Sequence, residues 1–388
     1  MIRARTDKPS HDGAAHNGRA AHVRRPPEPA DHALTYLDNH DPRPVLITGG
    51  AGFIGTNLAL RLLRGGHRVI LFDNLSRPGI RRNAEHLRAA FPAGVELVVG
   101  DVRDASLLHA LVTRAQAVFH LAAQVAVTTS LKDPAHDFEI NLRGTFNLLE
   151  AQRTCANPPP LLFTSTNKVY GELRNVPLQM RDDRYVPIDP QVRARGVTER
   201  ELDFHSPYGC SKGGADQYVL DYARTYDLPN VVFRMSCIYG RHQHGTEDQG
   251  WVAHFLIRAL RGEPITLYGD GRQVRDVLFV DDLIDAMVLA IQRQDVTATR
   301  AFNIGGGPGN AVSLLEMLRL IDAFDDTRVK CQMQPWRRGD QRYFVADTSA
   351  FRRATGWRPR IATRDGLAML HDWLVDEVPR QAITADEP

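Results

Sequence analysis

The chain has no long apolar run, few cysteines and almost no net charge, and each absence excludes a class of protein. No stretch approaches the roughly 20 apolar residues that a membrane-spanning helix needs, so we expect no membrane partner. The formal net charge is +2 over 388 residues, which gives no strong field that would attract nucleic acid. The four cysteines have no paired spacing, which excludes a disulfide framework and a zinc site and indicates a reducing cytoplasm. They are Cys155, Cys210, Cys237 and Cys331.

The two ends of the chain differ from the rest. Residues 1–43 are rich in Ala, Arg, His, Pro and Asp, and they lack the apolar segment of a secretory signal. We expect a disordered tail there, with one short helix near Ala33–Leu37 and solvated histidines rather than metal ligands. Residues 379–388 are expected to form a flexible C-terminus.

From Pro44 onward, short apolar strands alternate with helices. We expect strands at Val45–Thr48, Arg68–Phe72, Val95–Val99, Ala117–His120, Leu161–Ser165 and Val231–Met235. The intervening helices are expected at Phe53–Arg64, Ala105–Thr113, Phe138–Thr154 and Pro207–Tyr226. Apolar strands separated by helices predict an α/β fold, a Rossmann-type doubly wound parallel sheet over residues 44–240.

After about Gly240 the alternation of apolar strands and helices becomes less regular. This change predicts a smaller lobe, mainly for substrate binding, over residues 241–378. The expected elements are Trp251–Arg261, Ile265–Tyr268, Val277–Val280, Asp282–Ile291, Ala301–Ile304, Ser313–Phe324, Arg328–Met333 and Arg364–Val375. The insertion Leu173–Asp203 is polar and contains several prolines. Because long loops in compact domains are often functional, we expect this insertion near a pocket mouth or an interface.

A glycine pattern stands at the first strand–helix junction. Gly49, Gly52 and Gly55 follow the first strand and open the first helix. Backbone without a Cβ atom lets a pyrophosphate approach closely, and the helix N-terminus supplies N–H donors. This context favours a dinucleotide cradle over a structural turn. Gly305–Gly307 is followed by proline and predicts only a turn.

Two acidic residues end the next strands. Asp73 stands about 20 residues beyond the glycines, where a carboxylate holds the adenosine ribose diol and repels a 2′-phosphate. NAD is therefore favoured over NADP, although Arg77 could accept that phosphate. Asp101 ends the third strand, and it is either an acceptor for the adenine amino group or the N-cap of the following helix.

Tyr208 and Lys212 lie four residues apart, which puts both on one face of the predicted helix, about one turn apart. A free tyrosine has a pKa of about 10, and a nearby cation favours its phenolate. We therefore expect Lys212, together with a positively charged nicotinamide, to lower the pKa of Tyr208. Taken alone, the pair is equally consistent with a solvated helix face.

Taken together, the glycine pattern, Thr164–Gly171 and the Tyr208/Lys212 pair resemble the extended short-chain dehydrogenase/reductases that act on nucleotide sugars. The resemblance runs from Pro44 to about Trp373. Within that family the chain is most similar to the CDP-tyvelose (CDP-paratose) 2-epimerase branch. The segments behind this similarity are Ser165–Gly171, Leu202–Lys212, Asp248–Trp251, Gln273–Leu278 and Asp340–Asp347.

The resemblance implies a role for each matching residue. Thr166 would hydrogen-bond the reacting sugar oxygen, Tyr208 would be the general base and acid, and Lys212 would hold the nicotinamide ribose. The NAD-binding residues would be Gly49, Gly52, Phe53, Ile54, Gly55, Asp73, Asn74, Asp101, Val102, Leu121, Ala122, Ala123, Gln124, Asn141, Tyr208 and Lys212. The substrate would contact Thr166, Asn167, Gln249, Arg275, Arg337 and Asp340. Cys237 replaces an asparagine of many relatives, so contacts to the diphosphate are expected to differ in detail. A homodimer or homotetramer is implied as well.

The implied reaction is epimerisation through a transient ketone. A carbinol carbon without an adjacent carbonyl cannot be inverted by deprotonation, so bound NAD would oxidise it and the same NADH would reduce the other face. Tyr208 would remove the hydroxyl proton and return it. The resemblance favours C2, while a 4-epimerase would use the same side chains. A 4,6-dehydratase is disfavoured because Asn167 and Lys168 replace its usual Asp-Glu pair.

Other classes stay open at this point. A catalytically silent NAD-binding regulator would be favoured by loss of Tyr208 or Lys212, and both are present. A reductase that acts on an external ketone would exchange its cofactor in every turnover. The spacing of His242 and His244 before two acidic residues resembles a metal site, but a substrate-contacting loop is the preferred interpretation. Lys168 either faces the substrate or is solvated.

Overall fold

Seven strands form the central sheet, most of them in segments that the sequence predicts. All neighbouring strands are parallel, in the order β12-β8-β5-β4-β1-β2-β3. They are β1 (Val45–Thr48), β2 (Val69–Asp73), β3 (Val95–Val99), β4 (Ala117–His120), β5 (Leu161–Thr166), β8 (Asn230–Met235) and β12 (Arg300–Ile304). The chain runs outward in opposite directions from β1 and β4, so a crevice opens between their carboxyl ends. The predicted doubly wound α/β fold is confirmed.

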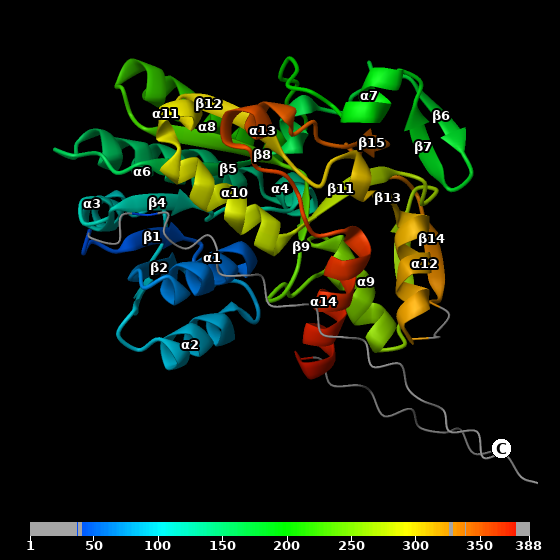
Figure 1. The fold of residues 1–388 in the computed structure, drawn as a ribbon, viewed down its shortest axis with the longest axis horizontal. Helices are drawn as coiled ribbons and strands as arrows, with labels where there is room; N and C mark the ends of the chain where they lie inside the picture. The colour runs from blue at the N-terminus through cyan, green and yellow to red at the C-terminus, as the bar shows by residue number, and fades with distance from the viewer. Residues whose placement is uncertain (1–36, 38–40, 326–328, 338, 378–388) are drawn as a thin grey trace, which may run out of the picture. The chain divides into compact units, whose positions relative to one another are not determined.

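The structure is a computed structural model that describes residues 37, 41–325, 329–337 and 339–377 (Figure 1). These residues belong to one unit, Ala33–Pro388. The predicted tail with its short helix lies outside the described residues, except for Leu37 and residues 41–43, and so does the predicted C-terminal segment 379–388. No helix among the described residues is long and apolar enough to cross a membrane.

Alternate side chains of the strands build two apolar layers. In β1, Val45 and Ile47 join one buried cluster and Leu46 joins the other, because successive side chains of a strand point to opposite faces. The first cluster packs under α1 (Phe53–Arg64) and α10 (Val280–Gln292). The second packs under α3 (Ala105–Val112), α6 (Gly144–Arg153) and α8 (Ser206–Thr225).

Smaller sheets form the second lobe. β9 (Cys237–Tyr239), β11 (Val274–Phe279), β13 (Ala311–Ser313) and β15 (Tyr343–Phe344) form one of them, and β10 (Ile265–Tyr268) pairs with β14 (Cys331–Gln334). Helices α9 (Trp251–Leu260) and α14 (Thr363–Glu377) lie side by side, near α12 (Leu314–Asp325) (Figure 1). β12 comes after several elements of the second lobe but belongs to the central sheet, so the two lobes alternate along the chain. The domain boundary predicted at residue 240 stays a prediction.

Some elements differ from expectation. The single helix expected at Phe138–Thr154 is instead α5 (Pro134–Phe138), a π-helical turn at Glu139–Arg143, and α6. Within this turn the Asn141 carbonyl accepts a hydrogen bond from the Thr145 hydroxyl, at 2.6 Å. π-Helical turns of this kind are frequent at functional sites. The chain also contains α2 (Ile80–Ala90), α4 (Val127–Lys132), α11 (Gln294–Thr297) and α13 (Ser349–Thr355).

The polar insertion is structured rather than a plain loop. It contains the hairpin β6 (Leu178–Arg181) and β7 (Arg184–Pro187), followed by α7 (Pro190–Arg195), at the upper right of Figure 1. The Arg184 guanidinium pairs with the carboxylate of Glu316 on α12, which fixes the hairpin to the second lobe.

Candidate active site

A cavity of about 850 Å³ runs from the carboxyl edge of the central sheet into the second lobe. Its wall contains residues that follow β1, β2, β3, β4, β5 and β8, together with residues of β10, β11 and the loop between β9 and α9. Every residue predicted for the site lines this cavity except Asn141. None of residues 173–203, all of which the structure describes, contributes to the wall. The insertion therefore does not line the cavity, and its expected position near the pocket mouth or an interface stays a prediction.

The first end of the cavity is built from glycine backbone. Gly49 has φ +69°, and a Cβ atom there would lie 2.8 Å from the backbone nitrogen of Ala122. A Cβ atom on Gly55 would lie 2.5 Å from the Gly49 carbonyl oxygen. A side chain is therefore excluded at these two positions, and the N-terminus of α1 is open to a ligand. A pyrophosphate group fits such a cradle.

Asp73 closes the same end of the cavity. Its carboxylate accepts hydrogen bonds from the backbone N–H groups of Ala51 and Leu75, at 3.1 and 2.9 Å. Burial raises its pKa, and these bonds and the nearby Arg77 oppose the rise. A carboxylate has about four lone-pair sites, so two are left for a ribose diol.

Asp101 is fixed by neighbours rather than by the following helix. The Arg103 guanidinium donates to both of its oxygens and holds the pKa of Asp101 well below its usual range. Asn74 donates to the same carboxylate at 3.1 Å. The N-cap of α3 is Asp104, which accepts from Leu107 N–H. The N-cap alternative for Asp101 is therefore wrong, and its contact with adenine stays a prediction.

Asn141 lies behind the cavity wall. Its side chain is only 1% exposed, and it accepts from the Gln124 N–H at 2.9 Å and donates to the Gln124 carbonyl at 3.0 Å. It also donates to the Ser211 hydroxyl of α8 and to Asp137. The expectation that Asn141 lines the cofactor is wrong, because its amide is committed to positioning Gln124 and α8.

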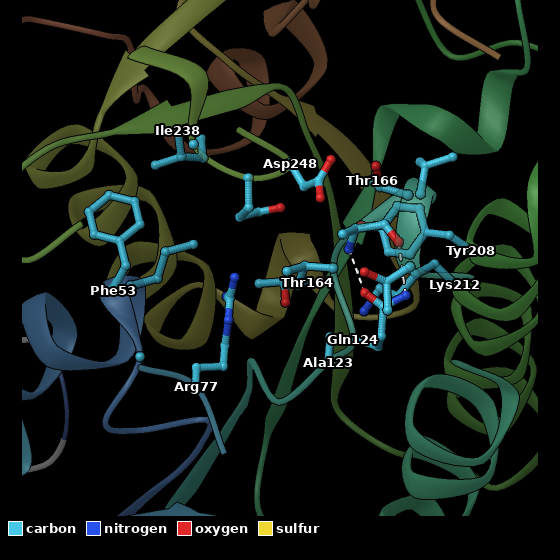
Figure 2. Close-up of a pocket in the computed structure, with 18 of the residues that line it drawn as sticks. Phe53, Arg77, Ala123, Gln124, Thr164, Thr166, Tyr208, Lys212, Ile238 and Asp248 are labelled. Carbon is cyan, nitrogen blue, oxygen red and sulfur yellow. Dashed lines mark hydrogen bonds between the residues drawn. The ribbon is translucent and has the colours of Figure 1, made fainter. Parts of the chain in front are cut away.

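Tyr208 and Lys212 lie in the middle of the cavity on one face of α8. Figure 2 shows Thr166, Tyr208, Lys212 and Gln124 gathered on one side, with Phe53 and Arg77 across from them. Tyr208 is 9% exposed and Lys212 3%. The Lys212 ammonium lies 4.1 Å from the centre of the Phe163 ring, a cation–π contact. The solvated helix face considered above is thus excluded.

In the chain without NAD the pKa of Tyr208 is raised rather than lowered, and the expected lowering in the presence of the nicotinamide stays a prediction. Burial raises the pKa of Tyr208 to about 12, and a hydrogen bond with Thr166 only partly opposes this rise. Burial also lowers the pKa of Lys212 to about 7. The physical reason is the same for both groups, because a dry cavity disfavours the charged phenolate and the charged ammonium alike.

The turn that follows β5 orients the side chain of Thr166. Its hydroxyl accepts a hydrogen bond from the Lys168 N–H at 3.2 Å and caps a short 3₁₀ turn, Asn167–Tyr170. This bond holds the hydroxyl at the carboxyl end of the strand, beside the Tyr208 phenol. Asn167 is buried in the same wall.

Cations gather beyond Thr166. The Arg275 guanidinium lies 2.7 Å from an oxygen of Asp340, and the Lys168 ammonium lies 3.8 Å from the same oxygen. Burial lowers the pKa of Lys168. One carboxylate therefore serves two cations, which leaves positive charge that suits a diphosphate. Lys168 faces the cavity, so the solvated interpretation is excluded.

Several wall residues were missed by the sequence reasoning. They come mainly from the second lobe and its loop, and they include Trp251, His254, Tyr268 and Gln273. Trp251 and Gln273 lie within segments already matched to the family, so position alone could have identified them. The other two depend on contacts between segments distant in sequence.

His242 and His244 lie outside the cavity wall. Their rings pack on Trp373 of α14, with centroids 5.3 and 5.9 Å away. Burial lowers the pKa of His242 to about 4. Within the described ranges, no group of three or more His, Cys, Asp or Glu side chains is placed to hold a metal ion.

Comparison with known proteins adds three findings. The model of the NAD dependent epimerase/dehydratase family matches residues 45–305. The chain is 43% identical over 337 residues to CDP-paratose 2-epimerase of Salmonella typhi, covering 85% of this chain and 98% of that protein. Two crystal structures of UDP-glucose 4-epimerases are also similar. That of Thermotoga maritima with UDP-glucose has a TM-score of 0.73 at 29% identity and covers 87% of this chain and 100% of that chain. That of Thermus thermophilus with NAD has a TM-score of 0.71 at 32% identity and covers 86% and 99%.

Proposed function

This chain belongs to the NAD-dependent epimerase/dehydratase family, and we propose that it inverts C2 of a nucleotide sugar of the CDP-paratose type. It is an enzyme that uses NAD and acts on nucleotide sugars. The observation that carries the C2 assignment is the 43% identity to CDP-paratose 2-epimerase over 98% of that protein. The glycine cradle and Asp73 fit the dinucleotide, and the cationic end of the cavity fits a nucleoside diphosphate.

Thr166 and Tyr208 handle the proton of the reacting hydroxyl. NAD, when bound, supplies the hydride acceptor and donor. The Thr166 hydroxyl holds the sugar oxygen, and Tyr208 takes its proton as the ketone forms and returns it on reduction. With a pKa of about 12, the phenol keeps its proton at neutral pH unless a positive charge lies beside it. Lys212 lies one turn along α8, but burial lowers its own pKa to about 7, so the positive nicotinamide of bound NAD would have to supply part of that charge.

Inversion requires that the ketone present its other face while the nucleotide stays bound. The cluster of Lys168, Arg275 and Asp340 supports this requirement, because it holds charge next to Thr166, and Arg275 and Asp340 belong to other segments than Thr166. The diphosphate can remain anchored there while the sugar ring turns at the Thr166 and Tyr208 end.

Dehydration is the less suitable alternative. Elimination of water needs a group that donates a proton to the leaving hydroxyl and a base at the neighbouring carbon. Asn167 is a neutral amide, and Lys168 is paired with Asp340 at 3.8 Å. Neither side chain supplies a carboxyl group at this position.

The direct test is incubation of the purified enzyme with a panel of CDP-, UDP-, GDP- and dTDP-linked sugars, with products identified by NMR. The proposal predicts inversion at C2 of a CDP-linked sugar without loss of water. Inversion at C4 would make the protein a 4-epimerase, and a 4-keto-6-deoxy product would make it a dehydratase. No turnover with any sugar, despite bound NAD, would favour a silent NAD-binding regulator.

A further inference from the structure

A buried carboxylate that the proposed mechanism does not use lies next to Gln124 and α8. Asp137 of α5 is 0% exposed and does not belong to the cavity wall. It accepts hydrogen bonds from the side-chain N–H groups of Gln124 and Asn141, at 2.8 and 3.1 Å, and from the Ser211 hydroxyl. All three donors are uncharged. They therefore favour the ionised form of Asp137 without neutralising its charge.

The contacts of Asp137 lead to the catalytic pair. Ser211 immediately precedes Lys212 on α8, and α5 packs against this helix. The Ser211 hydroxyl contacts the Asp137 carboxylate and also the Tyr208 carbonyl oxygen, the latter at 3.2 Å. Gln124, which donates to Asp137, lies on the same side of the cavity as Lys212 (Figure 2). A fixed negative charge thus lies one hydrogen-bonded side chain behind the catalytic pair.

Two carboxylates act on the charge of Lys212, and only one of them is paired with a cation. Burial lowers the pKa of Lys212 to about 7, and Asp216 and Asp137 oppose this lowering. The Arg234 guanidinium donates to both oxygens of Asp216, at 2.8 and 2.9 Å, so the charge of Asp216 is largely neutralised where it lies. The donors to Asp137 are neutral, so its charge is left for Lys212.

Two further titratable groups face Lys212, and both are uncharged near pH 7. Burial, together with Lys212 itself, lowers the pKa of His120 on β4 to about 3. Burial raises the pKa of Tyr208 to about 12, and the charge of Asp137 contributes to this rise. Lys212 and Asp137 are therefore the two charges that balance each other behind the reacting hydroxyl.

We propose that Asp137 is the positioning residue that supplies the counter-charge for Lys212 and holds it as an ammonium. The inference rests on the proposed function, because it assumes that Lys212 assists the proton transfer of Tyr208. Beside a positively charged nicotinamide, a second cation in a dry cavity is disfavoured. The Asp137 carboxylate offsets that repulsion. When Tyr208 gives up its proton, two positive charges then face two negative charges, and the site as a whole stays neutral.

The test follows the titration of Lys212 directly and needs no substrate. The chain has five lysines, so NMR of the full protein grown with isotope-labelled lysine gives few side-chain signals, and Lys212→Met assigns the one of interest. In Asp137→Asn the midpoint of this titration should fall by about one pH unit or more, because a nearby opposite charge is lost. Spectra are recorded with and without NAD, and the fall is expected in both.

Asparagine has nearly the size of aspartate and can still accept from Gln124 and Asn141, so Asp137→Asn should fold. Asp137→Ser is a second neutral replacement, which should lower the Lys212 midpoint to a similar extent and answers the question if the asparagine variant does not fold. An unchanged midpoint in the neutral variants would overturn the inference.

Ser211→Ala is the matched control. It removes one hydrogen bond to Asp137 but keeps the carboxylate, which still accepts from Gln124 and Asn141. The Lys212 midpoint should therefore move much less than in Asp137→Asn. An equal change in both variants would assign the effect to packing rather than to charge and would overturn the inference.

Turnover gives a second readout that a purely structural role would not move. Because the ammonium form of Lys212 is the active one, kcat should decline as the pH rises through its titration, and in Asp137→Asn this decline should begin at a lower pH. KM for the nucleotide sugar should stay near the wild-type value, since Asp137 does not line the cavity. A raised KM with an unchanged pH profile would contradict the inference. If the enzyme inverts a carbon other than C2, the proposed function fails, while the NMR titration still decides the role of Asp137.

Discussion

The two ends of the cavity are built in different ways. The dinucleotide end uses backbone, since glycines at a strand–helix turn and a carboxylate at the end of β2 define its shape. The substrate end uses side chains from separate segments, joined by ion pairs such as Arg275–Asp340 and by the stacking of Arg337 on Tyr268. Backbone geometry tolerates little variation, whereas paired side chains can be exchanged. The first end therefore suits a shared cofactor, and the second carries substrate specificity.

Tyr208 lies between the two ends of the cavity. Tyr208→Phe should abolish the chemical step while leaving cofactor and substrate binding in place. Removing the phenol oxygen removes the proton carrier and leaves the ring packing in place. We expect turnover to fall by about 100-fold or more, from the usual magnitude of general acid–base catalysis, with NAD still bound. Steady-state kinetics and the cofactor content of the purified protein measure both effects. Near-normal activity would contradict the acid–base role.

Gly55→Ala should break the dinucleotide end alone. The new Cβ atom would lie 2.5 Å from the Gly49 carbonyl oxygen, so the turn must shift. We expect NAD affinity to drop about tenfold or more, together with a loss of stability of about 1–3 kcal/mol. The NAD content of the purified protein and thermal unfolding report these changes.

Gly309→Ala is the control for this substitution. No heavy atom lies within 4 Å of a Cβ atom added there. NAD binding and thermal stability should match those of the wild type. If Gly55→Ala also retains normal NAD affinity, then the dinucleotide end is not determined by close backbone packing.

Arg275→Met should weaken binding of the nucleotide sugar at the substrate end and leave NAD binding at the dinucleotide end unchanged. Arg275 is buried, and its loss removes a cation from the cluster and leaves Asp340 with Lys168 alone. We expect KM for the nucleotide sugar to rise about tenfold or more, because truncating one partner of a buried charge pair is costly. NAD content should not change. An unchanged KM would remove Arg275 from the proposed diphosphate site.

The last expected effect concerns stability rather than binding or turnover: a pH dependence of the unfolding free energy from Lys212. Its folded pKa is lowered from 10.5 to about 7, so between these values the unfolded chain holds a proton that the folded chain releases. Stability should therefore rise with pH across this window, by at most about 1.4 kcal/mol per pH unit. Urea unfolding at pH 7 and pH 9 measures the difference. In Lys212→Met this contribution should disappear, and an identical pH dependence in both proteins would contradict it.

The strands and the dinucleotide end were accessible from the sequence because their signals are local. β1, β3 and β4 coincide with apolar runs predicted to the residue. The glycine turn lies within one strand–turn–helix unit, and Tyr208 and Lys212 share one helix face. Helix α2 was missed although its buried residues Ile80, Asn83, Ala84 and Leu87 follow helical spacing.

The substrate end depends on contacts that no local pattern contains. Tyr268, Glu247 and Arg337 come from three segments and meet only in the fold. The role of Asn141 depends on where Gln124 and Ser211 lie. The direction of the Tyr208 pKa shift could not be predicted either, because it is determined by how much water the folded cavity excludes.

The most direct test of the central claim uses CDP-paratose labelled with deuterium at either C2 or C4. If the enzyme oxidises and reduces C2, the C2-labelled substrate should show a primary kinetic isotope effect and the C4-labelled substrate should not. A primary isotope effect confined to the C4 label would contradict the account and assign the chemistry to C4.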